Sequence, residues 1–456
     1  MSMKGNILSM QRKDMQIKLP EDVKLIIDIL EAAGYEAYAV GGCVRDSLLG
    51  REPNDWDITT NAKPTQTKEL FYRTIDTGIQ HGTVSVLIHG CTYEVTTYRI
   101  DGEYEDSRHP KQVEFTTNLL EDLKRRDFTV NAMAYNDKTG IVDAFGGIDD
   151  LNNGIIRCVG NPEERFDEDA LRIMRAVRFA AQLGYSIEEN TLKAISKFAP
   201  RLKNISAERI NVELTKLIIS DNPGFIRIAI DTGITDIILP EISSLMNMEQ
   251  NNPHHCYNVG EHIIRSVENI RSDKVLRYAM LFHDIGKGST KTTDEDGVDH
   301  FHGHSDVSAE MAGQICNRLR FDNDTKNKVL KLIKYHDIAI ITDEKHVRRA
   351  INRIGKDLFP MLLEVKKADY MAQSLYKREE KEHEASRLHE IYRIITDRQD
   401  CISVSDLAIN GRTLIEAGIE SGPEIGRILE GLLDKVLDDP GLNTKEKLME
   451  LISCVK

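Results

Sequence analysis

The stretch that decides the fold runs from residue 41 to residue 60 and reads GGCVRDSLLGREPNDWDITT. A glycine pair opens it, and a carboxylate pair, Asp55 and Asp57, stands near its end. The β-branched residues after the second aspartate predict a strand over residues 55–60. Residues i and i+2 of a strand share a face, so Asp55 and Asp57 are expected to point one way and Trp56 the other.

Two parallel carboxylates repel each other unless a cation lies between them. Two Mg²⁺ ions fit this pair, because two metals stabilise both the attacking and the leaving oxygen of a displacement at phosphorus. Gly41 and Gly42, between a strand and a helix, let backbone N–H groups approach a triphosphate. An Asp-x-Asp pair alone is equally typical of a solvated surface, but the upstream Gly-Gly-x-x-Arg-Asp pattern favours catalysis.

The sequence around this stretch predicts an α+β fold class. Residues 21–33 have helical spacing that ends at Gly34. EAYAV, TVSVLI and YEVTTYR are rich in β-branched and aromatic residues and predict strands of a mixed sheet. Beyond about residue 155 the periodicity is almost wholly helical, from the segment 166–184 onward. We expect a head (1–155), a helical neck (156–245), a helical body (246–375) and a helical tail (376–456).

Composition excludes several classes of protein. The 456 residues include 60 basic and 74 acidic side chains, a net charge of −14, so a uniformly basic nucleic-acid coat is excluded and any phosphate-binding surface is a local patch. No apolar run reaches the roughly 18 residues of a membrane span, and the charged N-terminal stretch lacks a signal-peptide core. Seven cysteines without a C-x-x-C pair indicate a reduced, cytoplasmic chain without a zinc ribbon.

Several motifs together resemble a known family. GGCVRDSLLG followed by NDWDITTNA resembles the signature of the polymerase-β-type nucleotidyltransferases, and more narrowly of the tRNA nucleotidyltransferase and poly(A) polymerase family. RRDFTVN (125–131), DAFGGIDDL (143–151), the segment 155–185 and NISAERI (204–210) resemble the family's further motifs in the same order. The resemblance covers about residues 36–215.

The resemblance implies a polymerase-β-type nucleotidyltransferase head and a reaction. The enzyme would add CCA to the 3′ end of tRNA from CTP and ATP without a template, with Mg²⁺ and release of pyrophosphate. It also implies that the helical body holds the acceptor and TΨC arms of tRNA. We expect no DNA and no membrane as partner, and a monomer or homodimer. The main alternatives are an A-adding enzyme, a poly(A) polymerase and a phosphohydrolase acting on RNA 3′ ends.

The resemblance also assigns residues. Glu94 would be a third catalytic carboxylate beside Asp55 and Asp57, with a cross-strand salt bridge as the structural alternative. Asp127 and Asn131 are spaced i and i+4 at an expected helix start and would share a face, with helix capping as the alternative. The full set expected to bind nucleotide is Gly41, Gly42, Arg45, Arg126, Asp127, Asn131, Glu168, Asp169, Arg172, Arg175 and Arg178.

Three of these residues would select the incoming base. Family members use Glu-Asp-x-x-Arg here, which corresponds to Glu168, Asp169 and Arg172. A carboxylate accepts from the exocyclic amine that cytosine and adenine both carry, so protein side chains would replace a template. Macrodipole complementation and i,i+3 ion pairs are the structural alternative for these charges. The polar segment 99–110 resembles the flexible loop of members that add the terminal A.

A second group of residues lies in the expected body. Imidazole and carboxylate ligands spread over helices suit a divalent metal that activates water. The order H…HD…H…H…D resembles the HD-superfamily metal-dependent phosphohydrolases. By that resemblance the core ligands, for a divalent transition metal, are His262, His283, Asp284 and Asp369, and His304 and His336 are candidates for a second metal or for phosphate contact.

The C-terminal segment 406–440 resembles the tail of tRNA nucleotidyltransferases. Gly422-Pro423 predicts a helix start whose N–H groups are suited to a phosphate, with Arg412 and Arg427 assisting. Ordinary helix initiation on a helical scaffold is the alternative. This tail favours the tRNA enzyme over a poly(A) polymerase.

Overall fold

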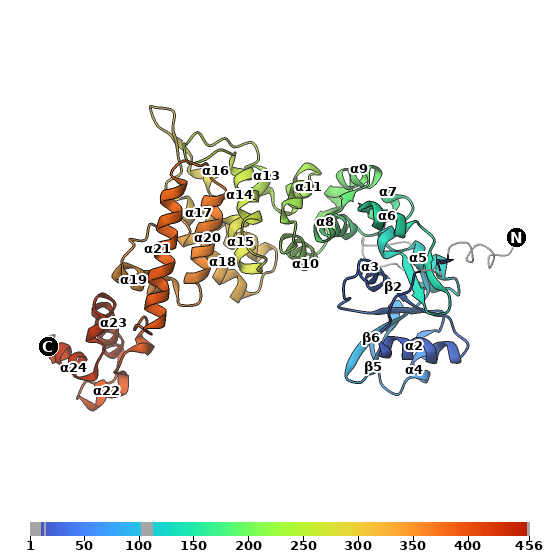
Figure 1. Ribbon diagram of the computed structural model, residues 1–456, viewed down its shortest axis with the longest axis horizontal. Helices are drawn as coiled ribbons and strands as arrows, with labels where there is room; N and C mark the ends of the chain where they lie inside the picture. The colour runs from blue at the N-terminus through green and yellow to red at the C-terminus, as the bar shows by residue number, and fades with distance from the viewer. Residues whose placement is uncertain (1–10, 13–14, 102–112, 454–456) are drawn as a thin grey trace. The chain divides into compact units, whose positions relative to one another are not determined.

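The computed structural model describes residues 11–12, 15–101 and 113–453 (Figure 1). The chain divides into two compact units, Met1–Pro240 and Glu241–Lys456. The first contains a sheet followed by helices, and the second is almost wholly helical, so the α+β expectation is confirmed. The finer division into head, neck, body and tail stays a prediction.

An eight-stranded mixed sheet forms the head. Its pairs are antiparallel except for one parallel pair, β3 with β6. In spatial order its strands are β1 (Gln11–Arg12), β10 (Gly140–Asp143), β9 (Met133–Asn136), β2 (Ala37–Val40), β3 (Asp57–Thr60), β6 (Cys91–Thr97), β5 (Thr83–Ile88) and β4 (Thr74–Gly78). A separate two-stranded ribbon pairs β7 (Arg99–Asp101) with β8 (Val113–Phe115).

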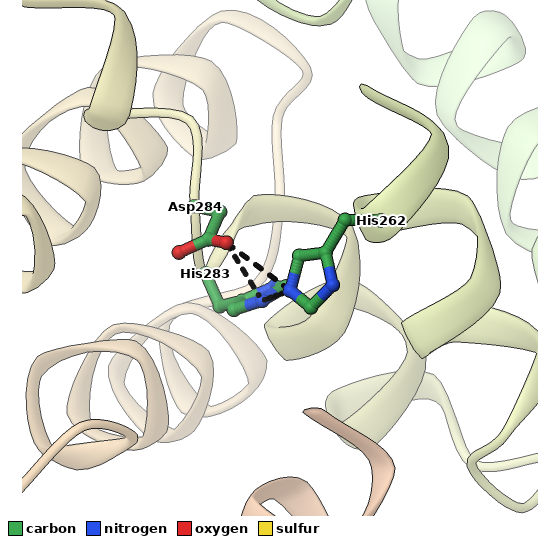
Figure 2. A group of neighbouring side chains, drawn as sticks. All are labelled: His262, His283 and Asp284. Atoms are coloured by element: carbon green, nitrogen blue, oxygen red, sulfur yellow. Dashed lines mark hydrogen bonds and ion pairs between the residues drawn. The ribbon is translucent and has the colours of Figure 1, made fainter. Parts of the chain in front are cut away.

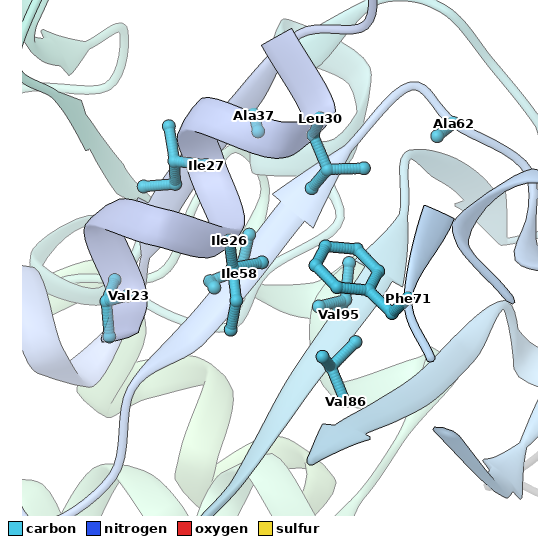
Figure 3. Close-up of a cluster of buried hydrophobic side chains, with 10 residues drawn as sticks. All are labelled: Val23, Ile26, Ile27, Leu30, Ala37, Ile58, Ala62, Phe71, Val86 and Val95. Atoms are coloured by element: carbon cyan, nitrogen blue, oxygen red, sulfur yellow. The ribbon is translucent and has the colours of Figure 1, made fainter. Parts of the chain in front are cut away.

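Both faces of this sheet are covered. Successive side chains of a strand point to opposite faces, and all four residues of β2 are buried. Ala37 packs into a core with helix α2 (Glu21–Ala32), and Tyr38 packs on the other face with helix α5 (Leu119–Lys124). Figure 3 shows the first of these cores, in which α2 lies over strands β3, β5 and β6.

Helix α2 follows directly from its sequence. Val23, Ile26, Ile27 and Leu30 recur at helical spacing and are at most 3% exposed. Acidic residues in the first turn complement the helix dipole. Each fully buried aliphatic side chain contributes about 1.5–3 kcal/mol, so this face fixes the helix on the sheet. The chain then turns at Gly34, whose φ of 87° favours glycine.

The catalytic stretch differs from its prediction in one respect. The strand begins at Asp57, and Asp55 lies in the preceding loop, so the predicted strand over 55–60 was two residues too long. Trp56 is half-buried and packs against two clusters of the head's core, which holds the loop beside the strand. The helix predicted after the glycine pair is confirmed as α3 (Gly42–Leu48).

Helices complete the first unit. The remaining ones of the head are α4 (Pro64–Leu70) and α6 (Gly147–Asn153). After them come α7 (Pro162–Glu168), α8 (Leu171–Leu183), α9 (Glu189–Phe198), α10 (Ala207–Ile218), α11 (Ile226–Asp231) and α12 (Ile234–Ile238), with a small parallel pair β11 (Ile155–Ile156) and β12 (Ser186–Ile187). The predicted helical segment 166–184 is therefore two helices, separated at Asp169 and Ala170.

The second unit is an array of helices. After the short α13 (Pro240–Ser243) it contains α14 (Val259–Glu268), α15 (Lys274–Phe282), α16 (Lys287–Thr290), α17 (His304–Arg318), α18 (Asn323–Tyr335), α19 (Glu344–Ile354), α20 (Phe359–Met371), α21 (Arg378–Asp397), α22 (Gly411–Glu416), α23 (Pro423–Asp438) and α24 (Lys445–Ser453). One hairpin, β13 (Thr292–Thr293) with β14 (Asp299–His300), interrupts them.

Two further expectations concern the chain as a whole. Most of the flexible loop expected over residues 99–110 lies outside the described residues; its start, Arg99–Asp101, is strand β7. Among the described helices, none combines the length and the apolar character needed to cross a membrane.

Candidate functional site

Three carboxylates meet at the start of strand β3. Asp57 is the pairing partner of Glu94 in the parallel strand β6, so their side chains share a face of the sheet. All three side chains are solvent-accessible. The surrounding protein nevertheless withdraws water from Asp57 and Glu94 and raises the pKa of both carboxyls, and the charge of Asp55 raises them further. Mutual repulsion of this kind indicates a cation site.

The donor set fits magnesium. Three carboxylates supply hard oxygen ligands, which Mg²⁺ prefers, and their accessibility leaves room for the waters and substrate phosphates that it retains. Thr59, two residues beyond Asp57 in β3, lies with its Oγ1 3.2 Å from Asp122 Oδ2 of α5. The carboxylates therefore lie on the face of the sheet that carries α5 and the basic pair after it.

That basic pair is held by an aspartate that sequence reasoning missed. Asp122 is fully buried and accepts a bond of 2.7 Å from Arg125 Nη2, and Arg126 Nη2 lies 3.4 Å from it. Burial raises the pKa of Asp122, but the two guanidinium groups outweigh burial and lower it. The i, i+3, i+4 spacing of this acid and the two arginines was the available signal.

Gly41 brings the backbone close to Arg126. Its φ of 87° favours glycine, and a Cβ added there would lie 3.0 Å from Arg126 Nη1. Ala39 pairs with Ile58, which places the end of β2 beside the start of β3. The charge of Arg126 also lowers the pKa of Asp57 against the effect of burial. The glycine turn, the arginine and the carboxylates thus form one site.

A chain of polar contacts links the next predicted residues. Arg45 donates to Asn131 at 2.5 Å, Asn131 donates to Asp127 at 3.2 Å, and Arg175 Nη2 lies 2.6 Å from Asp127. Burial alone would raise the pKa of Asp127, but the Arg175 charge lowers it to about 2. The expected proximity of Asp127 and Asn131 is confirmed, but a 3₁₀ turn (129–131) joins them instead of an α-helix.

Three guanidinium groups surround the ring of Phe179. Those of Arg45, Arg175 and Arg178 lie 5.1, 5.3 and 3.8 Å from its centroid. Arg178 also forms an ion pair with Glu213 of α10 at 2.6 Å, and burial lowers its pKa to about 10. Arg178 is therefore buried within the protein's own contacts, whereas Arg175 and Arg45 connect to the site through Asp127 and Asn131.

The predicted base-selecting residues lie at the break between α7 and α8. Arg172 donates to Glu168 at 2.7 Å and to the backbone carbonyl of Arg125 at 2.9 Å. Asp169 accepts from Arg209 of α10 at 2.9 Å. The break between the helices lets Asp169 turn out of the helical repeat, so the structure brings these residues beside the basic pair that follows α5. Arg209, inside the NISAERI motif, was not predicted as a site residue.

The second unit contains a buried cluster of histidines and aspartates (Figure 2). His262 of α14 lies with its Nε2 3.2 Å from both His283 Nε2 and Asp284 Oδ2. Asp369 of α20 completes this group, with its Oδ1 3.0 Å from His262 Nε2. Burial lowers the pKa of His262 and His283, but the carboxylates outweigh burial and raise both. The four predicted core ligands therefore converge.

Asp284 joins this group to a second one. Its Oδ1 lies 3.3 Å from His304 Nε2 and 3.8 Å from His336 Nε2, and the two imidazole nitrogens are 3.2 Å apart. His304 is the first residue of α17, and His336 directly follows the last residue of α18. Both histidines therefore lie at helix ends, and both are buried. The two oxygens of Asp284 face separate histidine pairs, and each of the two groups, His262 with His283 and Asp284, and Asp284 with His304 and His336, could hold a metal ion.

The outer contacts of the histidines fit metal binding. In each of the four rings, Nδ1 lies within hydrogen-bond distance of a backbone carbonyl, which leaves Nε2 facing the cluster. The acceptors are Ala372 for His262, Met280 for His283, Phe301 for His304 and Ile333 for His336, at 3.2, 2.7, 2.8 and 2.7 Å. The imidazole and carboxylate donors suit a divalent transition metal.

Two unpredicted side chains border this cluster. Lys287, 4% exposed, lies 2.7 Å from Asp284 Oδ2 and donates to Gln250 at 2.9 Å. The ring of His255 lies edge-on to that of His262, with centroids 5.2 Å apart. Burial lowers the pKa of His255 to about 3, so its imidazole is neutral. In the sequence, Lys287 is the last residue of the string HDIGK, which begins with His283 and Asp284. His255 stands next to His254, and this pair of histidines was the available indication for it.

Three families match successive parts of the chain. The Poly A polymerase head domain matches residues 37–157. The family described as "Probable RNA and SrmB- binding site of polymerase A" matches residues 184–246. A tRNA nucleotidyltransferase domain 2 family matches residues 292–452. The first match contains the carboxylates and the glycine turn, and the third contains most of the second unit.

Similar proteins cover the chain to different extents. A protein of Ligilactobacillus salivarius named CCA-adding enzyme is 54% identical over 208 residues, 45% of this chain and 52% of that protein. A protein of Limosilactobacillus reuteri with the same name is 34% identical over 443 residues, 95% of this chain and 96% of that protein. The chain belongs to the CCA-adding enzyme family. The first match spans about half the length of each protein, and the second spans nearly all of it.

A solved structure of this family supports the fold. The Bacillus stearothermophilus CCA-adding enzyme, in complex with CTP, is 29% identical and aligns with a TM-score of 0.71 over 96% of this chain and 99% of that chain. The resemblance to this family and the mixed-sheet head followed by helices are therefore confirmed. The individual roles of the site residues stay predictions. In the tail, the helix predicted at Gly422-Pro423 is confirmed as α23, with Arg412 and Arg427 exposed.

Proposed function

We propose that the chain adds CCA to the 3′ end of tRNA, with CTP and ATP as substrates and no nucleic-acid template. The observation that carries this proposal is the trio of Asp55, Asp57 and Glu94 beside the glycine turn and Arg126, in a member of the CCA-adding enzyme family. The family depends on a divalent metal, and the three carboxylates would hold two Mg²⁺ ions. When bound, these ions stabilise charge on the attacking and leaving oxygens.

The chain's own residues would arrange the reactants. The terminal 3′-hydroxyl attacks the α-phosphorus of the nucleotide, a P–O bond to the growing end forms, the bond to the β-phosphate oxygen breaks, and pyrophosphate leaves. Gly41 and Gly42 admit the triphosphate to the backbone, and Arg126 neutralises its charge with a planar fork. Arg175 and Arg45 would act by holding Asp127 and Asn131 in place.

Base selection would fall to Glu168, Asp169 and Arg172. The present pairs, Arg172 with Glu168 and Asp169 with Arg209, hold each group in a fixed orientation. A carboxylate accepts from the amino group of cytosine or adenine. Uracil and guanine do not offer the same combination, so the side chains would take the place of a template.

The helical second unit would hold tRNA through its backbone and shape, without reading most of its sequence. The exposed Arg412 of α22 and Arg427 of α23 fit phosphate contacts. We further propose a cytoplasmic enzyme without DNA or membrane as partner, acting as a monomer or homodimer.

A primer-extension assay tests the main proposal. Purified protein with Mg²⁺ receives tRNA ending at the discriminator base or in CC, with CTP, ATP or both, and the 3′ ends are sequenced. Growth by C, C and A that then stops is the expected result. Addition of A to the CC end alone would indicate an A-adding enzyme, and long A tails would indicate a poly(A) polymerase. Absence of any extension would overturn the proposal.

We propose a second activity for the helical unit, hydrolysis of phosphate esters on RNA 3′ ends. The observation that favours it is Asp284, whose two oxygens face two histidine pairs in a buried cluster. A bound transition metal would supply an activated water. Lys287, next to Asp284, would balance negative charge there. Release of inorganic phosphate from 3′-phosphorylated RNA by the metal-loaded protein tests this proposal, and it fails if Mn²⁺, Ni²⁺ and Zn²⁺ all give none.

A further inference from the structure

Beside the histidine–aspartate cluster, two chain segments meet whose side chains have no part in the ligand set. The turn 253–256 precedes α14, and the segment 372–381 follows α20 and enters α21. Backbone contacts fasten them together, because Ser374 N donates to the carbonyl of His254 at 2.9 Å and Ser374 Oγ donates to that of Pro253 at 2.5 Å. The two segments therefore form one wall of defined shape.

A lysine of this wall is connected to the cluster. Gln373 Nε2 donates to Asp369 Oδ1 at 3.1 Å, and Lys381 donates to Gln373 Oε1. Lys381 Nζ also lies 3.2 Å from His254 Nδ1. Its hydrogen-bond partners are neutral groups, and within the described part of the chain no carboxylate lies within ion-pair distance of it, although the charges of Asp369 and Asp337 act on it from farther away. A partly buried ammonium group that no carboxylate contacts directly is suited to an anion such as a phosphate.

The same wall exposes an aromatic ring. Tyr376 is 48% exposed, and its ring lies edge-on to His254 with centroids 4.9 Å apart. The adjacent Leu375 is 82% exposed. An exposed aromatic ring fixed in orientation beside a cation fits a ligand that carries both a charge and a flat base, because every nucleobase stacks on such a ring.

A third observation concerns His255 in the same turn. Its Nδ1 is buried and has no hydrogen-bond partner in the residues that the structure describes. A buried polar atom without a partner loses the hydrogen bond that water would give it. The ring of His255 also packs on His262, so this turn borders the cluster as well as the wall.

We propose that these segments form a nucleotide-binding subsite in the helical unit. Lys381 holds the phosphate of a nucleoside phosphate ester, and Tyr376 stacks on its base. The subsite rests on the proposed hydrolysis only in that it would place the ester beside the cluster. The shared chemistry is that of a free mononucleotide and of the terminal nucleotide of an RNA.

Binding and hydrolysis by the full chain test this proposal separately. Both are measured with Mn²⁺ in a background carrying Asp55→Ala and Asp57→Ala, so that the head's metal site does not contribute. Calorimetry follows the binding of adenosine 3′-monophosphate, of glycerol phosphate, which lacks a base, and of a short RNA ending in a 3′-phosphate. Phosphate release from each ester is recorded in parallel. Asp284→Ala identifies the part of each signal that belongs to the cluster.

The subsite predicts about tenfold tighter binding of the adenosine ester than of glycerol phosphate, a preference that Tyr376→Ala removes. Lys381→Gln should weaken both esters by a similar factor. Tyr72→Ala, at a 99% exposed tyrosine of the head, and Lys334→Gln, at a surface lysine, should change neither. Tighter binding of the RNA than of the mononucleotide would identify an RNA end as the ligand, and equal binding would identify the free nucleotide.

The outcomes that overturn the subsite differ from those that overturn hydrolysis. Equal binding of the two small esters, or binding unchanged by Tyr376→Ala and Lys381→Gln, removes the subsite even if phosphate is released. A preference that Tyr376→Ala removes, together with binding that Lys381→Gln weakens for both esters, supports the subsite; if no phosphate is released, the same result removes the hydrolase. No binding of any ester by the parent protein overturns the subsite outright.

Discussion

The two candidate sites of this chain are suited to cations in opposite ways. In the head, Asp55, Asp57 and Glu94 are solvent-accessible carboxylates at the start of a strand, and their ligands are oxygens only. In the helical unit, His262 and Asp284 belong to a cluster that is almost fully buried and mixes nitrogen with oxygen. The first arrangement suits a hydrated Mg²⁺ that arrives with substrate, and the second suits a resident transition metal.

This difference shows how the negative charge of each site is balanced within the protein itself. Arg126 balances part of the charge of the exposed carboxylates, while partial burial and the neighbouring negative charges raise the pKa of Asp57 and Glu94. The buried cluster neutralises itself, because the charges of Asp284 and Asp369 are balanced by histidines and by Lys287. The sites should therefore respond independently to mutation.

The largest effect is expected from Asp57→Ala. Loss of a metal-binding carboxylate should lower the rate of CCA addition about 10³-fold or more, because it removes charge stabilisation of the transition state. Phosphate release by the helical unit should not change. Single-turnover primer extension measures the first rate. The matched control is Asp76→Ala, at a surface pair with Lys68, and a comparable loss in both variants would contradict the assignment.

Asp284→Ala should disrupt the second site, the buried histidine–aspartate cluster, and leave the first site intact. Because this residue contacts both histidine pairs, the variant should lose metal at both, whereas His262→Ala should affect one. We expect hydrolysis to fall about 100-fold or more in Asp284→Ala, with CCA addition retained. Metal content by mass spectrometry is the direct measurement, with the exposed Asp306→Ala as control. Retention of full metal content in Asp284→Ala would refute a bridging role.

Asp127 sharpens the comparison through pH. Its pKa of about 2 lies below the ordinary value of 3.8, so the paired carboxylate stabilises the fold fully above about pH 4 and loses this contribution as pH falls toward 2. Asp127→Asn should lower the free energy of unfolding by about 2 kcal/mol at pH 5 and by much less near pH 2. Urea unfolding across this range tests it. Asp167→Asn, at an exposed pair with Arg201, is the control and should show no such pH dependence.

The smallest effect is expected from Arg209→Ala. Removal of its bond to Asp169 should loosen one base-selecting carboxylate and raise incorporation of UTP relative to CTP about tenfold, with little change in the rate for CTP. Competition assays with sequenced products measure this ratio. Arg201→Ala removes a surface pair of the same unit and should leave the ratio unchanged. Equal selectivity in the two variants would show that Arg209 has no positioning role.

Sequence patterns predicted those features of this protein that depend on residues close together in the chain. Three such features were predicted: the glycine turn at Gly41, the carboxylate pair and the order of the histidines. They could be predicted because backbone conformation and ligand type depend on the residues themselves. The helix at 21–33 and most strands followed from their apolar spacing. The predicted strand start at Asp55 was wrong, because packing of Trp56 against the core, and not β propensity, sets where the chain enters the sheet.

What only the tertiary structure decided concerns partners distant in sequence. The contacts of Asp57 with Glu94, Asp169 with Arg209 and Arg178 with Glu213 join different elements, and no local pattern specifies them. Asp122 was overlooked because its role depends on complete burial. A charged residue in a short helix is normally exposed, so the sequence gives no indication that this one is buried. The two-sided contact of Asp284 likewise arises only where several helices converge, since the sequence determines which ligands exist and packing determines which oxygen faces which histidine.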